Sequence, residues 1–422
     1  MKIFHKVQGE RRFFRVAYKW LINNDYDTAK LNLALIPEFG RWDDLINICY
    51  GTKAADVMAN IVFKQYCIDM VSNTPSLLGK WMPSENASNQ HTKEMARWFT
   101  RKFKTDPRTY RKSLSSLRKK INILEMLMST NQWDKIEFDK IPSKAGMKYR
   151  NAFAVKEVTA ARYKAFMENK ETKVNASVLN PVDIAEKALY KHLSHEETLG
   201  LCKYWDNLKD YYEGREENAI AVVDVSGSMS GQPMAAAVGM GAYIAEKSHG
   251  PFAGHFITFS RRPQLVEFQG DNIVDKLQRC RYADWGMNTN IEATMDLILN
   301  TAIEKKLSQT DLPARLYIFS DMEFDAAAFG TWRSSQREEI QRKTLFEIIE
   351  RKFNEAGYEM PKVTFWNLDA RTPNIPAIGD KFNYISGFSM SQMEAVMAGL
   401  SAEEMMLRVL NKYRYKDIQV AE

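Results

Sequence analysis

Apolar residues recur at the spacing of amphipathic helices through the first half of the chain. Phe13, Phe14, Ala17 and Leu21 form one such stripe near the start of the sequence. Helices of this length joined by short turns fit either a bundle or a HEAT-like array. No repeat of fixed period supports the array, and the choice between the two stays open. Residues 1–218 are therefore expected to form an all-helical domain, with later helices over 54–71, 92–103, 108–129, 148–168, 181–192 and 195–212.

From residue 219 the pattern changes to short apolar runs that alternate with helical segments. A run at 264–268 follows its neighbour too closely for a crossover helix, so we expect an antiparallel edge strand there. Residues 219–422 are expected to form a doubly wound, Rossmann-like α/β domain that binds ligands at the carboxyl ends of its strands. The runs with little polar alternation, typical of strands buried on both faces, are 219–223, 255–259, 315–319, 363–366 and 382–385.

Charge divides the chain at the same place. The 422 residues include 59 Lys plus Arg and 53 Asp plus Glu, and 45% are apolar, which excludes a disordered or collagen-like chain. Residues 1–218 hold 37 basic and 27 acidic side chains, a balance of +10, whereas 219–422 hold 22 and 26, a balance of −4. The basic half suits a polyanion and the acidic half suits a cation.

The cellular setting follows from what the sequence lacks. The four cysteines lie far apart, without a C-x-x-C pair, which indicates a reducing compartment. The N-terminus has no apolar run of signal-peptide length, and no stretch of about 18 apolar residues occurs. We therefore expect a cytoplasmic protein that does not use a membrane.

Oxygen-bearing side chains follow the first predicted strand. Asp224, Ser226 and Ser228 stand at alternate positions, so that a turning backbone directs their oxygens toward one point. Thr289, before a predicted helix, and Asp321, after the strand at 315–319, come to the same edge of a doubly wound sheet. These hard oxygens predict a Mg²⁺ or Mn²⁺ site. The simpler interpretation of the first three is that they cap the following helix.

This D-x-S-x-S pattern, completed by Thr289 and Asp321, resembles the metal-ion-dependent adhesion site of the von Willebrand factor A domain. The resemblance covers 219–422 and implies that an acidic residue of a protein partner completes the metal shell. Met287 is a departure, since many relatives have a second glycine there, and it affects the expected path of the Thr289 loop.

The first half also carries a resemblance, in the segment L-I-P-E-F-G-R-W-D-D-L at residues 35–45. This segment is similar to part of the helical TROVE module of the Ro ribonucleoproteins, which pair such a module with an A domain in this order. That similarity implies RNA binding. Residues 110–120, 141–145 and 319–325 resemble hallmarks of a Ro-like family catalogued only as a domain of unknown function, across most of the chain.

The densest positive charge lies in residues 101–120, where Asp106 is the single acid and Phe103 and Tyr110 are interleaved. Clustered Lys and Arg neutralise RNA phosphates, and aromatic rings can stack on unpaired bases. A solvated helix surface would give the same pattern. The candidate RNA-binding residues are Arg101, Lys102, Lys104, Arg108, Arg111, Lys112, Arg118, Lys119 and Lys120.

These features favour a non-catalytic, Ro-like RNA-binding protein with a Mg²⁺ adhesion site. A second hypothesis is an adaptor whose metal binds an acidic residue of a protein partner, without RNA. A metal-dependent hydrolase ranks third, because no general base with a recognisable role accompanies the predicted site. We therefore do not expect an enzyme.

Overall fold

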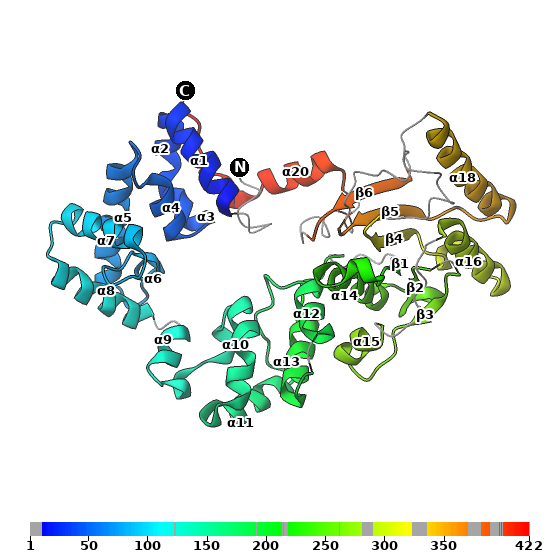
Figure 1. Ribbon diagram of the computed structural model, residues 1–422, viewed down its shortest axis with the longest axis horizontal. Coiled ribbons are helices and arrows are strands. Elements are labelled where there is room, and N and C mark those ends of the chain that lie inside the picture. Colours follow the sequence, from blue (N-terminus) through cyan, green and yellow to red (C-terminus); the bar gives the residue numbers. More distant parts are fainter. Residues whose placement is uncertain are drawn as a thin grey trace. The chain divides into compact units, whose positions relative to one another are not determined.

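The computed structural model describes residues 11–121, 124–190, 192–212, 214, 218–260, 262–280, 290–322, 336–369, 381–388, 396, 398 and 400–421, with backbone alone for 336–344, 402 and 405 (Figure 1). These residues form two compact units, each considered by itself. Unit 1 comprises the described residues of Met1–Ile136 and Gly399–Glu422, and unit 2 those of Glu137–Phe388 and Gln392–Ala398. Within the described ranges, no helix is long and apolar enough to cross a membrane.

Unit 1 is helical, as the apolar spacing predicts. Its core draws fully buried side chains from several helices, among them Ile22, Leu45 and Phe99. The buried face of the first helix is centred on Tyr18 and Ile22 rather than on Phe13, which is exposed. The helices of unit 1 are α1 (Arg11–Asn24), α2 (Tyr26–Asn32), α3 (Ile36–Phe39), α4 (Trp42–Cys49), α5 (Ala55–Val71), α6 (Leu78–Trp81), α7 (Gln90–Lys102), α8 (Pro107–Ile121), α9 (Leu124–Ser129) and α20 (Ala402–Leu410).

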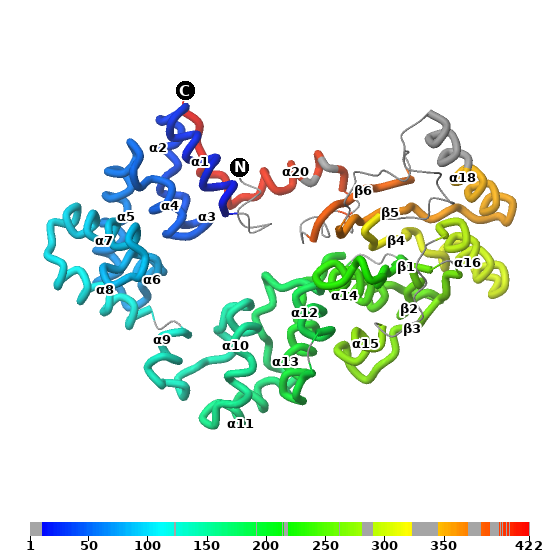
Figure 2. The backbone as a smooth tube through the Cα atoms, viewed as in Figure 1, coloured from blue at the N-terminus to red at the C-terminus, as the bar shows by residue number. Residues whose placement is uncertain are grey.

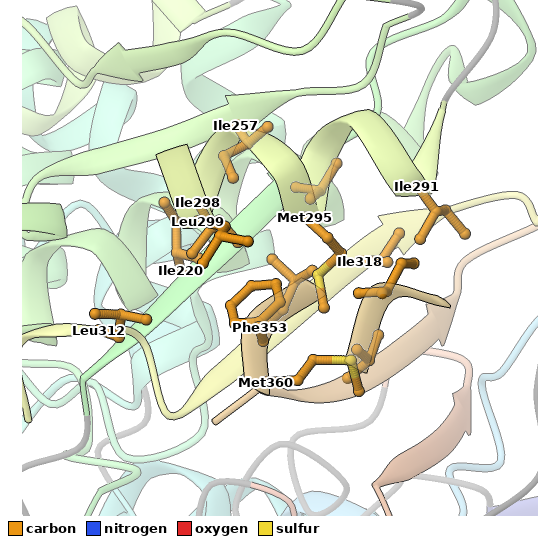
Figure 3. Close-up of a cluster of buried hydrophobic side chains, with 14 of the residues drawn as sticks. Ile220, Ile257, Ile291, Met295, Ile298, Leu299, Leu312, Ile318, Phe353 and Met360 are labelled. Carbon is orange, nitrogen blue, oxygen red and sulfur yellow. The ribbon is translucent and has the colours of Figure 1, made fainter. Parts of the chain in front are cut away.

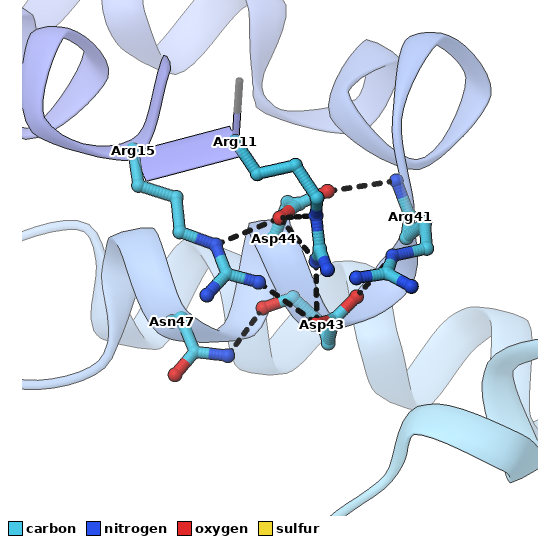
Figure 4. Close-up of polar contacts among 6 residues, drawn as sticks. All are labelled: Arg11, Arg15, Arg41, Asp43, Asp44 and Asn47. Atoms are coloured by element: carbon cyan, nitrogen blue, oxygen red, sulfur yellow. Dashed lines mark hydrogen bonds and ion pairs between the residues drawn. The ribbon is translucent and has the colours of Figure 1, made fainter. Parts of the chain in front are cut away.

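An ion-pair network fixes the start of α4 (Figure 4). Asp44 is fully buried and accepts hydrogen bonds from Arg15 Nε at 2.7 Å and from Arg11 Nη2 at 2.6 Å. Asp43 accepts from the same two guanidinium groups. Asp44 Oδ2 also accepts from the backbone N–H of Arg41, at the N-terminus of the helix. This carboxylate therefore caps α4 and holds α1 against it.

The C-terminal residues return to the N-terminal helices of the same unit (Figure 2). After α20 the chain makes a 3₁₀ turn at Tyr413–Tyr415 and then runs beside α1 and α2. Gln419 hydrogen-bonds to Asn32, and Ala421 to Thr28. Residues 411–421 therefore pack with α1 and α2 in one unit, although these segments are distant in sequence.

Unit 2 contains a six-stranded sheet of order β3-β2-β1-β4-β5-β6. All neighbouring strands run parallel except β2 and β3, which are antiparallel. The predicted strands and the antiparallel edge strand are therefore confirmed, and the strand order is that of a doubly wound, Rossmann-like sheet. The strands are β1 (Ala219–Val223), β2 (His255–Thr258), β3 (Leu265–Glu267), β4 (Arg315–Ser320), β5 (Lys362–Asn367) and β6 (Phe382–Ser386).

Helices cover both faces of this sheet. On one face, α16 and α18 pack over Ile220, Ile318 and Phe365, forming the apolar cluster of Figure 3. On the other face lies α14, where a Cβ at Gly241 would come within 2.5 Å of Val223 Cγ2. The helices of unit 2 are α10 (Ser143–Val155), α11 (Glu157–Glu168), α12 (Pro181–Leu189), α13 (His195–Asp206), α14 (Gln232–Lys247), α15 (Ile273–Cys280), α16 (Ile291–Glu304) and α18 (Gln336–Glu355).

The secondary structure changes from helices to alternating elements near Asn218, as expected, but the compact units divide after Ile136. Helices α10 to α13 pack with the sheet region, because α12 lies directly on α14. At that crossing a Cβ on Gly239 would lie 2.8 Å from the Pro181 carbonyl oxygen. The glycine therefore permits a close approach between two helices that are distant in sequence.

Candidate functional site

The end of β1 places Asp224 beside the end of β4. The two strands are parallel, with Val223 opposite Phe319, and the Asp224 N–H donates to the Phe319 carbonyl oxygen at 3.1 Å. Asp224 is 1% exposed and Asp321 is 5% exposed. The parallel register thus brings two buried carboxylates to the same edge of the sheet, as the sequence predicts.

Ser320 links these carboxylates. Its hydroxyl donates to Asp224 Oδ2 at 3.0 Å and lies 3.5 Å from Asp321 Oδ1. The same oxygen accepts from the Met322 N–H at 3.1 Å, where the backbone turns left-handed with φ of 62°. Ser320 is not among the predicted ligands, and the sequence signal that marks it is its place next to Asp321 at the end of a strand.

The electrostatics of Asp224 reflect its burial. Burial raises the pKa of Asp224 to about 6; hydrogen bonds from Ser226 partly offset the rise, and the charge of Asp321 adds to it. Within the described chain, no lysine or arginine forms an ion pair with Asp224. A cation at this edge would favour the charged carboxylate.

Two hydroxyls complete the described part of the site. Ser226 Oγ and Ser228 Oγ lie 2.9 Å apart, in the short turn that follows β1. The Ser226 N–H donates to Asp224 Oδ1 at 2.8 Å, which folds the turn back toward the carboxylate. These contacts bring Asp224, Ser226 and Ser228 together in one turn.

Thr289, the remaining predicted ligand, lies outside the described residues. Its neighbour Asn290 caps α16 by accepting from the Ala293 N–H at 3.0 Å. Among the described residues, no three His, Cys, Asp or Glu side chains cluster as a metal site. The set at the sheet edge instead combines two carboxylates with two hydroxyls, which is a hard-oxygen set of the kind that suits Mg²⁺.

The second candidate surface is the basic run on α7 and α8. The buried residues of α8 are Tyr110, Ser113, Leu114 and Leu117, which define its core-facing side. Eight of the nine predicted residues are exposed, and Arg118 is half-buried. In the described chain, five of the predicted residues have neither an ion pair nor a hydrogen bond from the side chain: Arg101, Lys104, Arg108, Lys112 and Lys119.

Other members of the run have partners. Arg111 pairs with Glu85 at 2.7 Å, and Lys102 pairs with Asp56. The Lys120 ammonium donates to the Met70 carbonyl oxygen at 2.5 Å. The two ion pairs reduce the positive charge available to a ligand, whereas the hydrogen bond leaves the charge of Lys120 in place.

Arg118 has a structural role in the fold. Its guanidinium donates to the carbonyl oxygens of Gly79 and Met82, at 2.9 and 3.0 Å, and to Ser84 Oγ at 2.9 Å. These bonds satisfy carbonyl groups around α6, whose last carbonyls lack helical partners. The expectation that Tyr110 stacks on a base is wrong, because its ring is 1% exposed and its hydroxyl donates to the Pro83 carbonyl oxygen at 2.9 Å.

Comparison with known proteins gives similarities over most of the chain. Residues 86–224 match the family described as "Domain of unknown function (DUF2828)", and residues 218–419 match "Domain of unknown function (DUF7788)". These matches confirm the predicted resemblance to families catalogued without a function, and they meet where the secondary structure changes.

Two individual proteins are also similar. "Uncharacterized protein L728" of Acanthamoeba polyphaga mimivirus is 36% identical over 364 residues, which cover 80% of this chain and 61% of that protein. The crystal structure of the Deinococcus radiodurans Ro (RSR) protein aligns over 95% of this chain and 93% of its own, with a TM-score of 0.41 and 12% identity. In sequence, the chain is thus similar to two adjoining families of unknown function and to about three fifths of a viral protein.

Proposed function

We propose that this protein binds RNA without catalysis, through the exposed basic side chains of α7 and α8. The observation that carries the proposal is the group of exposed cations that no acidic side chain of the described chain neutralises. The resemblance of residues 35–45 to a TROVE module supports the same function.

The helical spacing explains how these cations can contact one ligand. Arg108, Lys112 and Lys119 lie opposite the buried side of α8, so they share one face. Eleven helical steps separate the first from the last, which is about 16 Å along the axis. That length matches several phosphates of a nucleic acid helix.

The test compares two quadruple variants of the full chain. The probes are a hairpin RNA and an unstructured single-stranded RNA of equal length. Changing Arg101, Arg108, Lys112 and Lys119 to Ala removes up to four phosphate contacts. The slope of log affinity against log salt should then become less steep by about 2.8 to 3.6. The control changes four exposed cations of unit 2 to Ala: Lys305, Lys306, Arg351 and Lys362. Equal slopes in both variants, or no RNA binding by the wild type at low salt, would refute the proposal.

We further propose that the sheet edge binds Mg²⁺ or Mn²⁺ through Asp224, Ser226, Ser228, Thr289 and Asp321. Two buried carboxylates that approach one hydroxyl support this, together with the raised pKa of Asp224. The bound metal would supply an open coordination position for a carboxylate of a partner. Asp224 and Asp321 would hold the ion, and Ser320 would keep Asp224 oriented.

Calorimetry with the metal alone tests this site. The Asp224→Ala, Ser226→Ala double variant should lose measurable Mg²⁺ and Mn²⁺ binding. Ser230→Ala is the matched control, since Ser230 is an exposed hydroxyl of the same loop outside the predicted ligand set. Undiminished affinity in the double variant would end this assignment.

The adaptor is the alternative function, and the same sheet edge would serve it. An RNA complex should weaken steeply with salt, whereas a metal-bridged protein complex should respond chiefly to a chelator. In this proposal Asp224 and Asp321 both bind the metal, so neither carboxylate is left to act as a general base and the role is non-catalytic. Turnover of nucleotides or phosphoesters that disappears with Asp321→Ala would favour the hydrolase instead.

A further inference from the structure

The C-terminal tail, defined here as residues 411–421, makes hydrogen bonds to α2 of unit 1 through its backbone. Asn32 Nδ2 donates to the Gln419 carbonyl oxygen at 2.7 Å, and Asn32 Oδ1 accepts from the Gln419 N–H at 2.9 Å. The Ala421 N–H donates to Thr28 Oγ1 at 2.9 Å. One side-chain amide thus binds both polar groups of a single residue, which is how an extended peptide is bound regardless of its side chain.

A single aromatic side chain anchors the tail. Tyr415 is 6% exposed, and its ring packs edge-on against Phe39 at 5.1 Å between centroids. Arg414 lies over the same Phe39 ring at 5.4 Å. By contrast, the Gln419 side chain is exposed and Val420 is 77% exposed. Attachment therefore depends on Tyr415 and on the backbone near Gln419.

The packing beneath the tail is incomplete. A cavity of 320 Å³ remains between the tail and α1 to α3, lined mainly by apolar side chains such as Phe14, Leu21, Leu35 and Ile418. Side chains around a void lose the dispersion contacts that a filled interface would have. The tail is therefore held less firmly than a core segment.

We propose that the groove formed by α1, α2 and α3 is a peptide-binding surface, and that the C-terminal tail is its releasable occupant. When the tail leaves, the groove binds the same sequence supplied on another molecule. The tail, α1, α2 and α3 all belong to unit 1, so its release is an event within that unit.

The experiment uses the full chain and a fluorescein-labelled synthetic peptide of residues 411–422. The released variant combines Tyr415→Ala with Gln419→Pro. The first change removes the ring that packs on Phe39, and the second removes the Gln419 N–H that donates to Asn32 Oδ1. The matched control combines Tyr413→Ala with Gln419→Ala, which changes two exposed side chains and keeps the backbone. If the tail occupies the groove about nine tenths of the time, the released variant should bind the peptide about tenfold more tightly than the wild type.

Two further measurements separate release from misfolding. A peptide carrying Gln419→Pro should not bind the released variant, whereas one carrying Gln419→Ala should bind normally. Trypsin should cleave after Lys412, Arg414 and Lys416 faster in the released variant than in the control. Failure of the released variant to bind the peptide, or equal binding by all three chains, would overturn the proposal.

Discussion

Asp44 of unit 1 and Asp224 of unit 2 are both almost completely buried, but their surroundings differ. Asp44 lies between the guanidinium groups of Arg11 and Arg15, which donate to it at 2.6 and 2.7 Å (Figure 4). Among the described residues, the Ser320 hydroxyl and the Ser226 N–H donate hydrogen bonds to Asp224. Within the part of the chain that the structure describes, the charge of Asp44 is therefore neutralised by two arginines, whereas Asp224 has hydrogen bonds but no ion pair.

The difference indicates what each carboxylate does. A buried charge is tolerated when cations and hydrogen bonds compensate for lost hydration, so Asp44 belongs to the framework of unit 1. Asp224 keeps a raised pKa, which means that the fold disfavours its charged form. A residue of this kind is a candidate for binding an external cation.

Removal of the compensated carboxylate should have the largest effect. Asp44→Ala leaves Arg11 and Arg15 without their shared acceptor and removes the cap of α4, so the free energy of unfolding of unit 1 should fall by about 3 kcal/mol. Urea denaturation followed by circular dichroism measures the loss. Asp27→Ala is the control, because Asp27 is exposed in the first turn of α2 and its loss should cost less than about 1 kcal/mol. Equal losses in both variants would contradict the framework role of Asp44.

An external cation should have the next largest effect, confined to unit 2. At a hundred times its dissociation constant, Mg²⁺ should stabilise the metal-binding fold by about 2.7 kcal/mol, and a chelator should reverse this. Asp224→Ala should abolish the stabilisation, whereas Asp44→Ala should leave it intact. Thermal denaturation with and without Mg²⁺ makes the comparison. Stabilisation that survives Asp224→Ala would show that the ion binds elsewhere.

The smallest expected effect is that of Asp224→Asn, and its contrast with Asp44→Asn distinguishes the two aspartates most sharply. Asp224→Asn without metal removes a disfavoured charge and keeps an acceptor for the Ser226 N–H, so the free energy of unfolding should change by less than about 1 kcal/mol. Asp44→Asn, by contrast, should destabilise the protein because two cations lose their counter-charge. Denaturant titration in a chelator measures both. A large loss from Asp224→Asn would mean that its charge already has a partner in the folded chain.

Local sequence patterns determined the elements and part of the candidate site. The run at 219–223 is apolar at every position and forms a strand that is buried throughout, because a central parallel strand has no solvent face. Asp224 and Asp321 were predicted at one sheet edge from topology alone, since parallel strands end on the same side. The predicted helix 148–168 was less accurate: the structure divides it at Lys156, whose backbone is extended.

Local sequence patterns do not predict which distant segments contact one another, and only the tertiary structure determines those contacts. The sequence by itself determined that residues 101–120 are basic, but not that Arg118 would cap α6 or that Tyr110 would face the core. Likewise, neither the packing of α12 on α14 nor the return of the C-terminal tail to Asn32 has a signature in local periodicity. The physical reason is that spacing along a helix or strand reports which face is apolar, whereas the partner of that face depends on how the whole chain closes around its core.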